Sequence, residues 1–346
     1  MKHRLRLSSI ALVALTAVAA SVAPVYASPT GTAALLVGAL PAPPVGSGPG
    51  KLAVVRWPKG AAHVVPFGHA DTPGGNSFYV GVNARDDQVF IPSFAGTTDV
   101  VNLRTDKLVR QFKSIPGGRL AIVSPDGNLV FVLSGKALAA YSTRDDALRY
   151  EIPVGGNALA FNADASHLYV GGNMDLAIAD IEPSTGQILR RIPIGHSGDL
   201  AWARGQLFSA DIQSGVMSTF NPVTNEISSI PTGEVDPDFA YNKIPAATAG
   251  FMQLAVGPRQ HIVYAAGFSG HILRFSAMRP RYLGEVKVAV GNEGPNKLSG
   301  LAVLPHGAEG ITTIENRHES VVVDLRTGHV LQRLPGIASN RWVVTR

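Results

Sequence analysis

A short motif, in which an apolar residue is followed by proline, any residue and glycine, recurs through the chain and constrains its fold most. Five clear copies end in glycines that lie 50, 37, 40 and 38 residues apart. These glycines are Gly68, Gly118, Gly155, Gly195 and Gly233. Two altered copies follow, Val288–Gly291 without the proline and Leu334–Gly336 with a different spacing. Proline belongs at the end of a strand, because it cannot donate to a sheet ladder, and glycine allows the backbone to turn. The motif therefore predicts seven outer strands.

The segments before each motif share an order of short apolar runs and turns. In the clearest one, Leu168–Gly172, Leu176–Asp180 and Ile188–Ile192 have the composition of strands, and Ser184-Thr185-Gly186 forms a tight turn before the last of them. Three or four strands in a period of about 40 to 50 residues are typical of a β-propeller. A sandwich has no reason to repeat one turn seven times, and no long helical periodicity is present.

The two ends of the chain complement each other. Ser339–Thr345 has the pattern of one inner strand, whereas Ala33–Val37, Leu52–Trp57 and Ala62–Phe67 form a blade that lacks one. Pairing them would hide two sheet edges. We therefore predict an all-β, seven-bladed β-propeller with N/C-terminal strand closure. The other six blades are expected at 70–116, 117–154, 155–194, 197–232, 249–290 and 297–335, with a Pro/Gly-rich loop at 39–50 and an insertion at 234–248.

The first 27 residues have the pattern of a secretory signal peptide. Lys2, Arg4 and Arg6 precede an apolar run, and small residues stand one and three positions before a cut at Ser28. An uncleaved anchor is the alternative, but the run is shorter than the roughly 20 residues that span a bilayer. We expect a signal peptide at 1–27 and one propeller at 28–346. This predicts a periplasmic or secreted protein with no membrane span in the mature chain.

Composition excludes several functions. The chain has no cysteine, which excludes thiolate metal sites, haem attachment through Cys-x-x-Cys-His and cysteine nucleophiles. The first 27 residues contribute three of the five net positive charges, and the remaining basic residues are scattered. Nucleic-acid binding requires a continuous basic face, so we expect no nucleic-acid partner.

Residues in the third predicted blade after the composite one carry a resemblance to a known family. Tyr169-Val170, Ile178-Ala179-Asp180, Thr185-Gly186 and Ile192-Pro193-Ile194-Gly195 resemble YVTN-type propellers, whose fold is shared with the quinoprotein amine dehydrogenase heavy chain. The resemblance implies seven blades and a place outside the cytoplasm. It implies little about chemistry, because the architecture hosts lactonases, lyases, dehydrogenase subunits and binding modules. No functional residue carries over.

Candidate functional residues lie in the loops that run from an outer strand to the next inner strand, which should gather at one mouth of the central channel. A ligand-binding rim is predicted there, and we refer to this end of the molecule as the rim. Its predicted ligand-binding residues are Asp71, Arg119, Asn157, Asp238, Tyr241, Lys297 and Arg341. His69 and His196 are the candidate acid/base residues, and with them Asp199, Glu234 and Glu293 are the candidate metal ligands.

These residues leave two main hypotheses open. The first is an exported binding module that takes a small molecule or a protein at the channel mouth. The second is a metal-assisted lactonase- or lyase-type enzyme that holds a divalent metal at the same rim. A polar rim is also what any solvated propeller face presents, and no local ligand spacing such as His-Glu-x-x-His supports the metal. A subunit of a redox complex is a third, weaker alternative.

Overall fold

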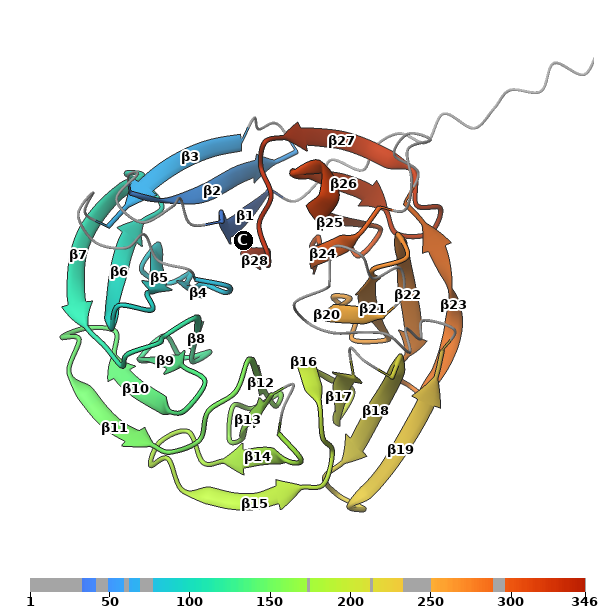
Figure 1. The fold of residues 1–346 in the computed structure, drawn as a ribbon, viewed down its shortest axis with the longest axis horizontal. Helices are drawn as coiled ribbons and strands as arrows, with labels where there is room; N and C mark the ends of the chain where they lie inside the picture. The colour runs from blue at the N-terminus through green and yellow to red at the C-terminus, as the bar shows by residue number, and fades with distance from the viewer. Residues whose placement is uncertain are drawn as a thin grey trace, which may run out of the picture. The chain divides into compact units, whose positions relative to one another are not determined.

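A computed structural model describes residues 33–41, 49–58, 62–68, 77–172, 175–211, 214–232, 250–288 and 296–345. These residues form seven four-stranded antiparallel sheets arranged around a common axis (Figure 1). The predicted seven-bladed β-propeller is confirmed. None of the described residues lies in an α-helix, and the described part of the chain contains no helix that could span a membrane.

Six of the sheets each use four consecutive strands of the chain. The first two comprise β4 (Gly81–Asn83), β5 (Gln88–Pro92), β6 (Thr97–Asn102) and β7 (Lys107–Lys113), then β8 (Leu120–Val123), β9 (Leu129–Leu133), β10 (Leu138–Ser142) and β11 (Leu148–Ile152). The next two comprise β12 (Ala158–Phe161), β13 (Leu168–Gly171), β14 (Ile178–Ile181) and β15 (Ile188–Ile192), then β16 (Ser197–Ala203), β17 (Gln206–Asp211), β18 (Val216–Asn221) and β19 (Glu226–Pro231). The last two comprise β20 (Phe251–Val256), β21 (Ile262–Gly267), β22 (His271–Ser276) and β23 (Arg281–Lys287), then β24 (Leu298–Val303), β25 (Glu309–Ile314), β26 (Glu319–Asp324) and β27 (Val330–Pro335). A 3-10 turn, Glu315–Arg317, follows β25.

The seventh sheet joins the two ends of the chain, as the sequence predicts. Its strand order is β28 (Val343–Thr345), β1 (Ala34–Ala39), β2 (Gly50–Trp57) and β3 (Ala62–Phe67). The antiparallel pairing of β28 with β1 runs from Leu35 opposite Thr345 to Val37 opposite Val343. We call this sheet the composite sheet.

The C-terminal segment is also fixed by side chains of the neighbouring sheet. Trp342 is 2% exposed, and its indole N–H lies 3.2 Å from both Thr313 Oγ1 and Ser320 Oγ. Thr313 Oγ1 in turn donates to the carbonyl of Ser339. The closure therefore depends on buried contacts with β24–β27 as well as on strand pairing.

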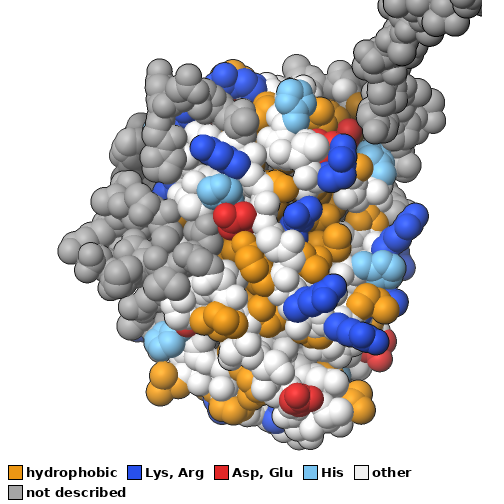
Figure 2. All heavy atoms as spheres, turned by 90° about the vertical axis from the view of Figure 1, so that its right-hand side faces the viewer, with side chains coloured by type: hydrophobic (Ala, Val, Ile, Leu, Met, Phe, Trp, Pro, Cys, Tyr) orange, Lys and Arg blue, Asp and Glu red, His pale blue; other side chains and the backbone are white. Residues whose placement is uncertain are grey.

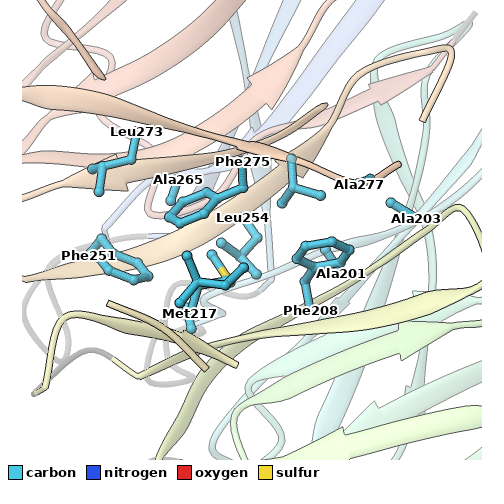
Figure 3. Packing of buried hydrophobic residues seen from close by; sticks show 13 residues of the cluster. Ala201, Ala203, Phe208, Met217, Phe251, Leu254, Ala265, Leu273, Phe275 and Ala277 are labelled. Atoms are coloured by element: carbon cyan, nitrogen blue, oxygen red, sulfur yellow. The ribbon is translucent and has the colours of Figure 1, made fainter. Parts of the chain in front are cut away.

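Apolar packing lies between the sheets. One buried cluster occupies each of the seven interfaces between neighbouring sheets. Successive residues of a strand point to opposite faces, so β9 directs Phe131 towards β12–β15 and Val132 towards β4–β7. A middle strand such as β9, Leu129–Leu133, is therefore apolar along its whole length. Figure 3 shows one interface, where Phe208 and Met217 of β16–β19 pack against Phe275 of β20–β23.

The outer strands differ because only one of their faces is covered. Residues of β7 and β23 alternate between half-buried and exposed along the whole strand. Seen from the side on which β23 lies, Lys and Arg side chains are spread among hydrophobic ones (Figure 2). The recurring Pro-x-Gly motif follows or overlaps the end of these outer strands, where the chain leaves for the next innermost strand.

Two irregular segments are predicted from the sequence, a loop at 39–50 and an insertion at 234–248. The loop predicted at 39–50 is too wide, because Ala39 belongs to β1 and Gly50 to β2, and their pairing continues to Ala39 opposite Leu52. Leu40, which follows β1, is buried and donates its backbone N–H to the Lys51 carbonyl. The insertion predicted at 234–248 lies outside the described residues, as does the cleavage site before Ser28.

Candidate functional site at the rim

The described rim residues lie where the innermost strands begin. Arg119, Asn157 and Lys297 each directly precede an innermost strand, namely β8, β12 and β24. Asp199 is the third residue of β16, and Arg341 stands two residues before β28. The innermost strand is the first strand of the sheet in six sheets and β28 in the seventh. These seven strands begin at the same end of the propeller, so all five residues lie at that end.

Two of these residues form an ion pair across the propeller axis. Arg341 Nη1 contacts Asp199 Oδ1, and the side chains are 15% and 1% exposed. The other carboxylate oxygen accepts the backbone N–H of Leu254 in β20, at 2.7 Å. Burial raises the pKa of Asp199, and the positive charge of Arg341 opposes that rise. Both oxygens of Asp199 are thus engaged by protein groups.

Arg341 also connects the composite sheet to the next sheet. Its guanidinium carbon lies 4.4 Å from the centre of the Tyr79 ring, which places the cation over the aromatic face. Tyr79 and Phe78 donate their backbone N–H groups to the carbonyl of Arg119, at 3.3 and 2.8 Å. A parallel bridge between Tyr79 and Leu120 accompanies these bonds.

Arg119 and Asn157 continue the series of contacts between sheets. Arg119 Nη2 donates to the carbonyl of Gly156, at 2.9 Å, which lies just before β12. Asn157 Nδ2 donates to the carbonyl of Gly198 in β16, at 3.3 Å. Each side chain therefore reaches backbone of the sheet that follows its own.

Lys297 lies at the interface between β20–β23 and β24–β27. Its ammonium group pairs with Glu315 Oε2 at 2.9 Å and lies 5.0 Å from the centre of the Phe268 ring. The neighbouring Asn296 donates its side-chain amide to the carbonyl of Val288, at 3.0 Å. These contacts fix the start of β24 against the preceding sheet.

The described rim residues thus form a blade-to-blade network, by which we mean the contacts of Arg119, Asn157, Asp199, Lys297 and Arg341 with sheets other than their own. From the sequence these residues are predicted to bind a ligand or, for Asp199, a metal. The structure shows that each of them contacts protein groups, and it tests neither assignment. The partners Tyr79 and Glu315 were missed. The one sequence signal for Tyr79 is its position just before an innermost strand, β4, which would have placed it at the rim.

His196 occupies a different position from the network. It is exposed, adopts a left-handed backbone with a φ of 56°, and donates its N–H to the carbonyl of Asp175 at 2.8 Å. It directly precedes β16 and therefore lies at the same end of the propeller as Asp199. The remaining candidates lie outside the described residues: His69, Asp71, Glu234, Asp238, Tyr241 and Glu293.

The candidate metal set is only partly described. Within the described ranges, no group of three or more His, Cys, Asp or Glu side chains gathers as a metal site would. Asp199 and His196 are the described members of the predicted set, and Asp199 has Arg341 as its counter-ion. The metal remains a prediction that depends on Glu234, Glu293 and His69.

Comparison with known proteins supports the fold. No protein family and no curated protein sequence matches the chain. Among solved structures, Kuenenia stuttgartiensis hydrazine synthase superposes with a TM-score of 0.62 at 10% identity, covering 79% of this chain and 89% of that one. U3-55K superposes with a TM-score of 0.63 at 12% identity, covering 76% and 83%.

The WD40 repeats of RRP9 give a similar result. They superpose with a TM-score of 0.64 at 12% identity, covering 76% of this chain and 82% of theirs. Identities this low show a shared fold alone. The likeness to YVTN-type propellers remains a prediction, and function has to be argued from the residues.

Proposed function

We propose that this chain is an exported binding module that holds a small molecule or a protein segment at the rim. The observation that carries the proposal is the blade-to-blade network. It fixes the starts of the innermost strands and is bridged across the axis by Arg341 and Asp199. A polar floor fixed by these contacts, with the exposed residue His196 directly before β16, suits recognition, because little ordering entropy is lost when a ligand binds.

Native mass spectrometry of the mature protein, purified from the periplasm, tests the binding proposal. We expect a mass above that of the denatured chain, and we expect His196→Ala to lose the excess. His329→Ala is the matched control, because His329 is also exposed but follows the turn before β27, at the opposite end of the propeller. Equal native and denatured masses, or an excess that survives His196→Ala, would contradict the proposal.

The identity of the excess mass distinguishes the alternatives. An organic molecule would support the binding module. A divalent ion would support the metal-assisted enzyme instead, and Glu234→Gln and Glu293→Gln should then release the ion.

Export is proposed from the first 27 residues and has its own test. We expect the purified periplasmic protein to begin at Ser28, and N-terminal sequencing measures this directly. Retention of Met1, or recovery of the chain in the cytoplasm, would contradict export.

A further inference from the structure

A polar groove lies at the end of the propeller opposite the rim, between the sheets β4–β7 and β8–β11. Its volume is about 750 Å³. Its lining comes from the β4–β5, β8–β9 and β10–β11 turns, from residues of the strands next to these turns, and from Arg110 of β7. These turns join strands at the end where the innermost strands finish, so the groove is separate from the rim. We call it the turn-side groove.

The walls of the turn-side groove are held together by hydrogen bonds within the sheet β8–β11 and between it and β4–β7. Asn83 Nδ2 donates to the carbonyl of Gly127 at 3.1 Å, and Thr143 Oγ1 donates to the same carbonyl at 2.6 Å. Arg110 in β7 crosses to the other sheet, where its Nη2 donates to the carbonyl of Thr143 at 2.9 Å and its Nε pairs with Asp146 at 2.8 Å. The groove is therefore formed before any ligand binds.

Four arginines but only two carboxylates line the groove. Arg110 is bound to Asp146, and Arg149 contacts Asp145 at 3.3 Å. A side-chain hydrogen bond with Ser142, the backbone N–H of Ala147 and the charge of Arg149 lower the pKa of Asp145, so its carboxylate stays ionised. The lining arginines are Arg85, Arg110, Arg144 and Arg149, and the lining carboxylates are Asp86 and Asp145.

The other two arginines are available. Within the described part of the chain, the guanidinium groups of Arg85 and Arg144 make no hydrogen bond and no ion pair within 4 Å, although Arg85 attracts Asp126 from further away. Both residues are exposed, and they stand in turns of different sheets, the β4–β5 turn and the β10–β11 turn. Two cations that have no partner among the described residues thus border one preformed groove from its two walls.

We propose that the turn-side groove binds a multiply charged oxyanion, held between Arg85 and Arg144. A guanidinium has a planar set of donors that matches the two oxygens of a phosphate or a carboxylate, and it stays charged throughout the physiological pH range. A ligand with two acidic groups would contact both walls. The site is independent of the rim and of the proposed function there.

Titration calorimetry with inorganic pyrophosphate and with citrate, in about 10 mM salt where the screening length is roughly 30 Å, tests the site. We expect saturable binding of at least one of them. Binding of pyrophosphate alone would identify a phosphate-bearing ligand, and binding of citrate alone a carboxylate-bearing one. The double variant Arg85→Gln/Arg144→Gln should weaken binding at least about tenfold, which corresponds to about 1.4 kcal/mol.

Arg326→Gln is the matched control. Arg326 is exposed and holds the same position in the turn between β26 and β27 as Arg144 holds between β10 and β11, with its N–H on the preceding Asp324 carboxylate at 2.8 Å. It should leave the affinity unchanged. The absence of saturable binding by either anion would overturn the proposal. An unchanged affinity in a double variant that keeps the wild-type unfolding midpoint would overturn it as well.

Discussion

Arg341 and Asp199 form an ion pair between two sheets that are not neighbours in the ring. Arg341 belongs to the composite sheet and Asp199 to β16–β19, with two sheets between them on one side of the ring and three on the other. Arg341 also precedes β28, the strand that closes the propeller. The pair therefore connects the closure of the ring to its far side, in surroundings where solvent does little to screen either charge.

Removing the cation of this pair should destabilise the fold. Arg341→Met leaves the Asp199 carboxylate buried without its counter-ion, and we expect the free energy of unfolding to fall by about 3 to 5 kcal/mol. Adding Asp199→Asn should recover part of that loss, because a neutral amide oxygen still accepts the Leu254 N–H. Urea denaturation of the single and double variants measures both effects.

An exposed ion pair provides the control for that experiment. The side chains of Arg149 and Asp145 are 48% and 57% exposed, so Arg149→Met should leave the free energy of unfolding close to that of the wild type. Equal losses in Arg149→Met and Arg341→Met would show that burial of the Arg341 pair contributes nothing.

Trp342 should account for much of the stability of the closure. Trp342→Ala removes a large buried side chain from the interface with β24–β27 and should lower the free energy of unfolding by about 3 to 5 kcal/mol. Trp342→Phe keeps most of the ring but loses the indole N–H, so it should cost less. Thr313 and Ser320 remain hydrogen-bonded to each other, at 2.9 Å. Thermal and urea unfolding measure both variants. Equal stability of Trp342→Ala and Trp342→Phe would contradict a stabilising role for the ring.

Gly38 is required by the close approach of the C-terminal segment to β1. A Cβ atom there would lie 2.4 Å from Ser339 Oγ and 2.6 Å from Ser339 Cβ. Gly38→Ala should therefore displace the segment before β28 and lower the unfolding midpoint.

Gly257→Ala is the matched control for Gly38→Ala. A Cβ atom at Gly257 would meet its nearest neighbour at an ordinary 3.5 Å. Its midpoint should stay near that of the wild type, and a similar shift in both variants would mean that the approach of Ser339 is not what constrains Gly38.

Much of this architecture could be predicted because it is repeated. The Pro-x-Gly motif places outer-strand ends, and Ser339–Thr345 was recognisable as an inner strand without partners. The predicted loop at 39–50 is too wide. The sequence here is rich in proline and glycine, as loops are, whereas Ala39 pairs with Leu52 of β2 and Gly50 pairs with Phe67 of β3.

The contacts at the rim could not be predicted from the sequence. Asp199 and Arg341 stand in unrelated blades, and nothing local in either segment identifies the other as its partner. Only the curvature that closes seven sheets into a ring brings them together. The same holds for the turn-side groove, where Arg85 and Arg144 lie in ordinary polar turns until the two sheets are placed side by side.

Tyr141 should make the fold sensitive to alkaline pH. It is 4% exposed in β10, and its ring centre lies 5.3 Å from that of Phe112. Burial, together with the negative charge of Glu151, raises the pKa of Tyr141 to about 12. In the unfolded chain the phenol ionises at about pH 10. Between those two values the folded state binds more protons than the unfolded state, so stability falls as pH rises through this window and is unaffected below it.

The contribution of Tyr141 to this fall should be about 2 to 3 kcal/mol, since each unit of pKa difference corresponds to about 1.4 kcal/mol. Burial also raises the pKa values of Tyr150, Tyr169 and Tyr264, so the wild type should lose more than this in total. Tyr141→Phe keeps the ring contact with Phe112 and removes one ionisable group. Its free energy of unfolding, measured by urea denaturation at intervals from pH 9 to pH 12, should decline less steeply than that of the wild type by about that amount. Parallel declines would mean that the Tyr141 phenol reaches solvent in the folded state, and that the interface between β4–β7 and β8–β11 is looser than its packing indicates.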